Sequence, residues 1–160
     1  MVTIEKLTTK FGEAIEPLEA AEWPTVRVRP EAIVRVCGFA KSDPDLDLNY
    51  LPDLTAVDWG DRFEMVYHLY SMHHRHGLVL KVDLPHDGPR IDSVCGVWRA
   101  ANWFEREVYD MFGITFNGHP DLRRILMPEG TRSFPLRKDF DFVEDPEDPL
   151  AVEPKDQTRD

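Results

Sequence analysis

Hydrophobic residues near the N-terminus recur at helical spacing. The recurring positions are Ile4, Leu7, Phe11 and Ala14. This three-to-four residue period predicts a short amphipathic helix. A second run with the same spacing follows Pro30, a residue that fits the first turn of a helix. The inward positions of that second helix would be Ile33, Val36, Cys37 and Ala40.

The middle of the chain changes to a period of two, which is typical of strands. In residues 62–72, one face carries Phe63, Met65, Tyr67 and Leu69, and the other carries Glu64, Val66, His68 and Tyr70. Leu78, Leu80 and Val82 repeat the alternation after a short turn at residues 73–77, so the two runs predict a hairpin. Two further strands are expected at residues 25–29 and 51–59.

Residues 92–112 form the strongest helical pattern. One apolar stripe consists of Val94, Val97, Ala101, Phe104, Val108 and Met111. Asp92 suits the start of such a helix, where the helix dipole favours negative charge, and Gly113 suits its end. Trp98, Trp103 and other aromatic residues fall off the stripe. We therefore expect a second surface to cover this helix.

Residues 113–142 combine many breakers with many apolar residues. Glycines and prolines interrupt the segment too often for a long helix or strand, yet it is too apolar for a disordered region. We interpret it as an extended C-terminal arm that lies on another protein. The predicted organisation is a core domain at 1–112, the C-terminal arm at 113–142, and a flexible acidic tail at 143–160.

Composition restricts the possible partners. The chain has 160 residues, enough for one domain, and 30 Asp and Glu residues against 19 Lys and Arg give it a net charge of −11. An acidic domain repels phosphate backbones, so no nucleic acid partner is expected. Cys37 and Cys95 are too few for an iron–sulfur cluster. The sequence contains neither a secretory signal nor an apolar run of about 18 residues, so membrane contact is expected only through partners.

Histidines are the first candidates for chemistry. His73, His74 and His76 could bind a metal, but in a predicted turn their rings would splay apart, so we interpret them as solvated turn residues. His119, beside Pro120 and Asp121, could relay protons, although a hydrogen-bonded structural role is more typical. Phosphate-binding glycine loops and nucleophile motifs are absent from the sequence, and no catalytic, cofactor-binding or metal-binding residue is expected.

Charged residues of the last helix and the C-terminal arm are the second candidates. Glu105, Glu107 and Asp110 point to different sides of a helix, so a buried or interfacial ion-pair network is favoured over acid–base catalysis. Arg106 and Asp110 are four positions apart and could pair. Arginines of the C-terminal arm could grip carboxylates of a partner.

The same region carries a recognisable motif. The sequence reads ERExxD at 105–110, then His119 and Asp121, RRIL at 123–126, and PLRKDF at 135–140. This series resembles the signature of the C-type subunits of proton-pumping NADH–quinone oxidoreductase, which form the 30-kDa subunit family of respiratory complex I. The residues taken as family signature and predicted partner interface are Glu105, Arg106, Glu107, Asp110, His119, Asp121, Arg123, Arg124, Pro135, Leu136, Arg137, Lys138 and Asp139.

The resemblance implies both a fold and a function. The fold would be α+β, a two-layer domain with a mixed sheet followed by an extended C-terminal arm. The chain would be a non-catalytic structural subunit in the hydrophilic arm of the complex, an enzyme of the translocase class. Equivalent subunits of membrane-bound nickel–iron hydrogenases, or of quinone reductases with another electron donor, are the alternative.

Partners and location also follow from the resemblance. The chain would bind no cofactor itself, while FMN and iron–sulfur clusters would sit in partner subunits and NADH and quinone would be substrates of the complex. Its partners would be the 49-kDa-type (D-type) subunit and neighbouring iron–sulfur subunits, and it would lie peripherally on the cytoplasmic face of the cell membrane. Thr131–Phe134 depart from the usual family pattern, so the C-terminal arm is expected to dock differently there.

Overall fold

The computed structural model describes residues 2–19 and 22–140 of the chain. Its helices are α1 (Val2–Phe11), α2 (Ile33–Ser42) and α3 (Ala101–Phe112), with 3-10 turns η1 (Gly12–Ala14) and η2 (Pro30–Ala32). Its strands are β1 (Ile15–Leu18), β2 (Thr25–Val28), β3 (Tyr50–Asp58), β4 (Arg62–Ser71), β5 (His76–Pro85), β6 (Arg90–Asp92) and β7 (Thr115–Asn117). The predicted tail at 143–160 lies outside the described residues.

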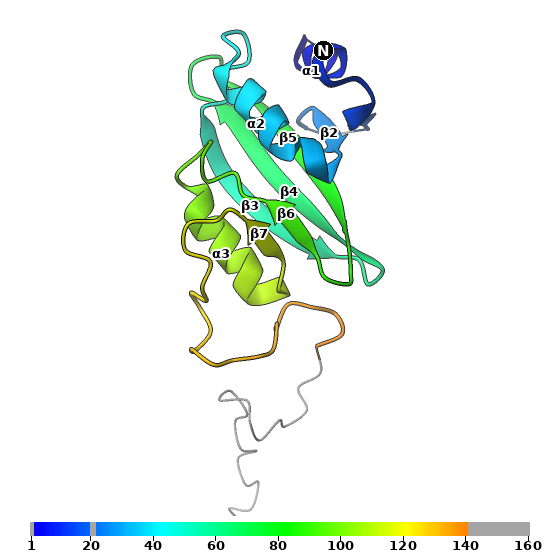
Figure 1. Ribbon diagram of the computed structural model, residues 1–160. Coiled ribbons are helices and arrows are strands. Elements are labelled where there is room, and N and C mark those ends of the chain that lie inside the picture. The colour runs from blue at the N-terminus through cyan, green and yellow to red at the C-terminus, as the bar shows by residue number, and fades with distance from the viewer. Residues whose placement is uncertain (1, 20–21, 141–160) are drawn as a thin grey trace, which may run out of the picture.

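Five strands form one mixed sheet in the order β1-β2-β5-β4-β3. The pair β2–β5 is parallel, whereas β1–β2, β3–β4 and β4–β5 are antiparallel. Helices α2 and α3 lie in front of this sheet in Figure 1, together with the short parallel pair β6–β7. The predicted α+β class with a two-layer domain and a mixed sheet is therefore confirmed.

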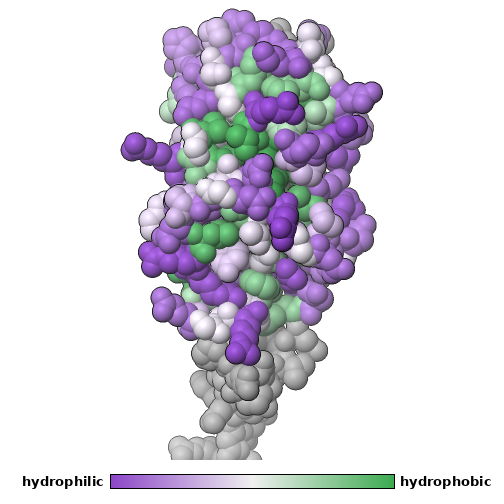
Figure 2. Space-filling model, in the orientation of Figure 1, coloured by the Kyte–Doolittle hydropathy of each residue, from purple (hydrophilic) through white to green (hydrophobic). Residues whose placement is uncertain are grey.

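The core lies between the sheet and these helices. Phe63, Met65, Tyr67 and Leu69 of β4 are fully buried, as the two-residue period predicted. Helix α2 adds Ile33, Val36, Cys37 and Ala40, the four positions expected to face inward. Figure 2 shows the outside of the same face, where hydrophobic residues form small areas divided by hydrophilic side chains.

The prediction of one helix over 92–112 is wrong in its first half. Residues 90–92 form strand β6, residues 95–97 form a turn, and α3 begins only at Ala101. Asp92 caps no helix, because the residue before α3 is Ala100; the Asp92 carboxylate instead accepts a hydrogen bond from Asn117. The end was predicted correctly: Gly113 has φ +73° and donates its N–H to the Tyr109 carbonyl.

The packed domain continues beyond residue 112, where the core was expected to end. Strand β7 pairs with β6, and Ile114 and Phe116 are buried in the core. Residues 118–140 then contain only turns, bends and irregular backbone. The extended character of the C-terminal arm thus begins after β7.

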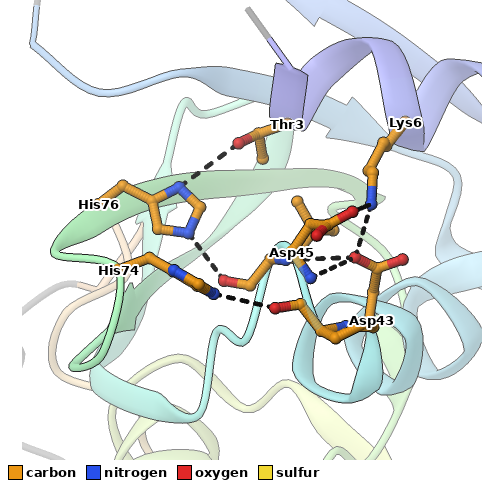
Figure 3. A network of polar contacts seen from close by, with 8 residues as sticks. Thr3, Lys6, Asp43, Asp45, His74 and His76 are labelled. Atoms are coloured by element: carbon orange, nitrogen blue, oxygen red, sulfur yellow. Dashed lines mark hydrogen bonds and ion pairs between the residues drawn. The ribbon is translucent and has the colours of Figure 1, made fainter.

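The histidine-bearing turn between β4 and β5 holds α1 and the loop after α2 in place (Figure 3). The Nε2 atom of His76 donates to the Leu46 carbonyl at 2.7 Å, and that of His74 to the Pro44 carbonyl at 2.9 Å. Lys6 of α1 pairs with Asp43 at 2.9 Å. The rings of His74 and His76 are therefore engaged with backbone oxygens, while His73 is exposed as expected.

Candidate functional site: a clasp between the last helix and the C-terminal arm

The signature residues of α3 are turned inward. Glu105 and Asp110 are fully buried, and Arg106 is nearly so, although all three are charged side chains on a 12-residue helix. Buried charges need compensating partners. In this structure the partners come from the C-terminal arm and from the loop before α3.

Asp110 is the central residue of this arrangement. Its Oδ2 accepts three consecutive backbone N–H groups, from Ile125 at 3.0 Å, Leu126 at 2.7 Å and Met127 at 2.9 Å. Its Oδ1 lies 2.7 Å from Nη1 of Arg124. Burial alone would raise the pKa of Asp110, but these four donors outweigh burial and hold the pKa below its ordinary value.

Arg106 secures the same stretch of the C-terminal arm from the other side. Its guanidinium donates to the carbonyls of Arg123 at 3.1 Å and Arg124 at 3.0 Å, and it lies over the Trp103 ring. The predicted pairing of Arg106 with Asp110 is wrong, because each side chain takes its partners from the C-terminal arm instead. We call Arg106, Asp110, Arg124 and the backbone of 123–127 the clasp.

Glu105 fixes the loop that precedes α3. It accepts hydrogen bonds from Ser93 Oγ at 2.6 Å, the Val94 N–H at 2.7 Å and Cys95 Sγ at 3.3 Å. Burial raises the pKa of Glu105, although these donors act in the opposite direction. Burial likewise raises the pKa of the Cys95 thiol to about 11, so at neutral pH Cys95 stays a thiol.

His119 is held by hydrogen bonds through both ring nitrogens, as expected for a structural histidine. Its Nδ1 accepts the Asp121 N–H at 3.0 Å, and its Nε2 donates to the Asn102 carbonyl at 3.1 Å. These two bonds assign the proton to Nε2. The ring therefore has no free lone pair to offer a metal or a substrate, although Cys95, Glu105 and His119 lie within 4.8 Å of one another.

The clasp is the first attachment of the C-terminal arm, and a second anchor, formed by Phe134 and Arg137, surrounds Gly113. Arg137 donates to the Phe112 carbonyl, and its guanidinium lies over the rings of both Phe63 and Phe134. A Cβ on Gly113 would come within 2.7 Å of the Phe134 ring. Phe134 therefore packs directly onto the end of α3, and the Arg124 guanidinium lies over its ring as well.

Asp58 provides a third anchor at the end of β3. It accepts the Lys138 N–H at 2.8 Å and the Gly60 N–H at 2.7 Å. Burial opposes ionisation of Asp58, but these N–H groups, with His86 and the charge of Lys138, lower its pKa. Asp58, Ser93 and Phe134 were not predicted as anchors, because their partners are backbone groups or residues distant in the sequence.

The structure divides the signature residues into two groups. The first group is buried or half-buried, and its side chains bind other parts of the packed chain: Glu105, Arg106, Asp110, His119, Arg124 and Arg137. The exposed members are Glu107, Asp121, Arg123, Leu136, Lys138 and Asp139, with Pro135 half-buried. Asp121 and Arg123 pair with each other at 2.9 Å. Of the arm arginines expected to bind carboxylates of a partner, Arg124 binds Asp110 and Arg137 binds the Phe112 carbonyl, both within this chain.

The geometry defines a class: a small mixed-sheet domain whose charged last helix clasps an irregular C-terminal arm. Residues 26–146 match the family model described as the 30-kDa subunit of respiratory-chain NADH dehydrogenase. The chain therefore belongs to that family, as the motif at 105–140 predicted. Among the described residues, no helix is long and apolar enough to cross a membrane.

Individual relatives agree with this assignment. A C-type subunit of NADH-quinone oxidoreductase from Rhizobium etli, numbered 2, is 51% identical over a stretch that covers 82% of this chain and 72% of the relative. The corresponding C-type subunit of Roseiflexus sp. is 46% identical, covering 85% of this chain and 80% of its own length. A solved trypsin-resistant fragment of Nqo5 has a TM-score of 0.65 and 28% identity, covering 76% of this chain and 97% of the fragment.

Proposed function

We propose that this chain is a structural subunit of the hydrophilic arm of a proton-translocating NADH–quinone oxidoreductase, without catalytic residues of its own. The observation that carries the proposal is the use made of the charged signature residues. Glu105, Asp110 and His119, the groups suited to acid–base chemistry, are each saturated by hydrogen bonds that fix the chain's own backbone. Their arrangement supports a structural role for these residues rather than acid–base catalysis.

The proposed partners are the 49-kDa-type subunit and the neighbouring iron–sulfur subunits. Leu126 and Leu136 are 63% and 54% exposed. Their backbone is already fixed, because the Leu126 N–H donates to Asp110 in the clasp and the Leu136 N–H donates to the Met111 carbonyl. Fixed, exposed apolar side chains lose little entropy when a partner covers them. On the other face of the sheet, Trp23, Val57, Val66 and Val79 line an open groove of about 630 Å³ that offers a further contact surface.

Cofactors and location belong to the same proposal. FMN and the iron–sulfur clusters would be held by partner subunits, with NADH and quinone as substrates of the complex. The chain would lie peripherally on the cytoplasmic face of the membrane, attached through its partners. Its charge of −11 supports attachment through protein rather than through anionic lipid headgroups.

Site-specific photo-crosslinking tests the proposed interface. A photoreactive residue is placed at Leu126 or Leu136 in the chain produced in its own cells, with Met72, which is 64% exposed on the β4–β5 turn, as the matched control. We expect positions 126 and 136 to crosslink to the 49-kDa-type subunit more strongly than position 72 does. Equal crosslinking from all three positions, or none to a respiratory protein, would overturn the proposed interface.

A further inference from the structure

Two carboxylates and one imidazole, from distant parts of the sequence, meet at one end of the sheet. Asp58 ends β3, His86 lies in the loop after β5, and Asp139 belongs to the C-terminal arm. One ligand atom of each lies within 4.8 Å of the other two. This convergence depends on the third anchor, because the hydrogen bond from the Lys138 N–H to Asp58 brings Asp139 to the sheet.

The imidazole of His86 has a fixed orientation, and it faces Asp58 without a hydrogen bond to it. Its ring stacks on Phe63 with 4.8 Å between centroids and 10° between planes, which fixes where its nitrogens point. Nε2 lies 3.8 Å from Oδ2 of Asp58, too far for a hydrogen bond. Within residues 2–19 and 22–140, neither nitrogen of this ring makes a hydrogen bond to another residue.

That separation suits two ligands of one ion. Zinc binds nitrogen and oxygen at about 2.0–2.2 Å, so tetrahedral ligand atoms lie roughly 3.3–3.6 Å apart. The gap between His86 and Asp58 needs a change of only a few tenths of an ångström. Asp139 is exposed and its side chain can adjust by a rotamer change.

Charge at this end of the sheet also favours a cation. Two carboxylates, of which Asp58 has only 2% of its side chain exposed, approach within 4.8 Å of each other. Like charges at this distance repel, most strongly where water is excluded. Two cationic side chains lie nearby, and neither ends at the carboxylates: Lys138, whose charge acts on Asp58, has its Nζ 6.0 Å from the Trp59 centroid, and the Arg137 guanidinium lies over Phe63 and Phe134.

Other clusters do not offer comparable ligands. The ring of His119, beside Cys95 and Glu105, is committed through both nitrogens. His74 and His76 donate to backbone carbonyls from Nε2. Two three-residue clusters contain a histidine, and of these two only His86 has ring nitrogens without a hydrogen bond in the described part of the chain.

We propose that Asp58, His86 and Asp139 form a binding site for a divalent transition-metal ion of the zinc type, with water completing the coordination. The ion ties the end of the C-terminal arm to β3 and to the loop after β5. This site is independent of the proposed function, since all three ligands come from this chain. The end of the C-terminal arm is then attached to β3 twice, by the hydrogen bond from the Lys138 N–H to Asp58 and by the metal ion.

Zinc binding to the full-length, metal-free chain tests the site. Calorimetric titration with Zn²⁺ is carried out on the parent chain and on His86→Gln, Asp139→Asn and the control His73→Gln, each checked for unchanged circular dichroism. We expect one saturable site, weakened at least about tenfold by either ligand substitution and unchanged by the control. Zn²⁺ should also slow hydrogen exchange at the Lys138 amide.

Three results would overturn the inference. The first is the absence of saturable binding to the parent chain, and the second is binding that survives both His86→Gln and Asp139→Asn. The third is loss of binding in the His73→Gln control alone, which would assign the ion to the β4–β5 turn. Asp139 is exposed, so its substitution keeps the test valid even where His86→Gln disturbs the packing on Phe63.

Discussion

The carboxylate of Asp110 lies 2.7 Å from the guanidinium of Arg124, and this buried pair joins the last helix to the C-terminal arm. The same carboxylate holds three consecutive N–H groups of the C-terminal arm. A segment without regular secondary structure is thereby fixed by one side chain of a helix. The domain and the beginning of the C-terminal arm form one packed unit.

Replacing Asp110 with alanine should be strongly destabilising. The substitution leaves a largely buried guanidinium and three backbone N–H groups without an acceptor, and breaking a buried ion pair costs about 3–5 kcal/mol. Urea unfolding should show this loss, and hydrogen exchange at 125–127 should become fast. Asp121→Ala, which removes an exposed pair with Arg123, is the control and should change stability by less than about 0.5 kcal/mol. Equal effects of the two substitutions would contradict the clasp.

Stability should fall in acid through Asp110. Its pKa is lowered in the folded chain, so the folded state binds fewer protons than the unfolded state. This contribution is therefore complete above the ordinary carboxyl pKa of about 4 and is lost as the pH falls through the lower, folded value. Urea unfolding of the parent and Asp110→Ala should give a constant difference above about pH 5 that shrinks below about pH 4. A difference that grows in acid would refute the assignment.

Gly113→Ala should loosen the second anchor. The residue has φ +73°, and an added Cβ would meet the Phe134 ring at 2.7 Å and the Arg137 guanidinium at 2.8 Å. We expect a loss of about 1–3 kcal/mol, from backbone strain and overpacking. Gly96→Ala is the matched control, because no atom lies within 4 Å of the place that its Cβ would occupy and its φ is ordinary. Thermal unfolding of both variants measures the difference, and an equal loss in both would contradict the second anchor.

Alanine substitutions of Arg137 and Lys138 should have different effects, the first on the stability of the chain and the second on its incorporation into the complex. Arg137→Ala removes the bond to the Phe112 carbonyl and the contacts with Phe63 and Phe134, so it should lower the melting temperature of the isolated chain. Lys138 anchors the C-terminal arm through its backbone N–H, which Lys138→Ala retains. Lys138→Ala should therefore leave the melting temperature within about 1 °C, in line with a surface substitution, and reduce incorporation into the complex. Native gels of detergent extracts measure incorporation, and unchanged incorporation would place Lys138 outside the interface.

Local periodicity predicted the elements whose side chains alternate between core and surface. The run from Phe63 to Leu69 needed only its own pattern to identify β4. Strands β6 and β7 have three residues each and pair across more than twenty positions, so no local period marks them. Val94 and Val97 fit a helical stripe, yet that segment forms the turn that Glu105 holds by hydrogen bonds.

The sequence identified the residues of the clasp, but it did not show that their partners lie in the same chain. The charged motif drew attention to Asp110, Arg106 and Arg124, and it favoured a buried or interfacial ion-pair network. The hydrogen-bond partners of Asp110 and Arg106 could not be predicted, because they are mostly backbone N–H and carbonyl groups, which every residue type carries. Interaction with a partner protein was inferred for side chains that fold back onto their own chain.

Affinity purification of the tagged chain from its native membranes, solubilised in mild detergent, tests whether the chain is a subunit of the complex. We expect the 49-kDa-type, flavin-bearing and iron–sulfur subunits to co-purify with the chain, with NADH–quinone activity in the eluate. Recovery of the chain alone would contradict its role as a structural subunit. Recovery with a nickel–iron hydrogenase large subunit, and without flavin-bearing subunits, would assign it to a different respiratory machine.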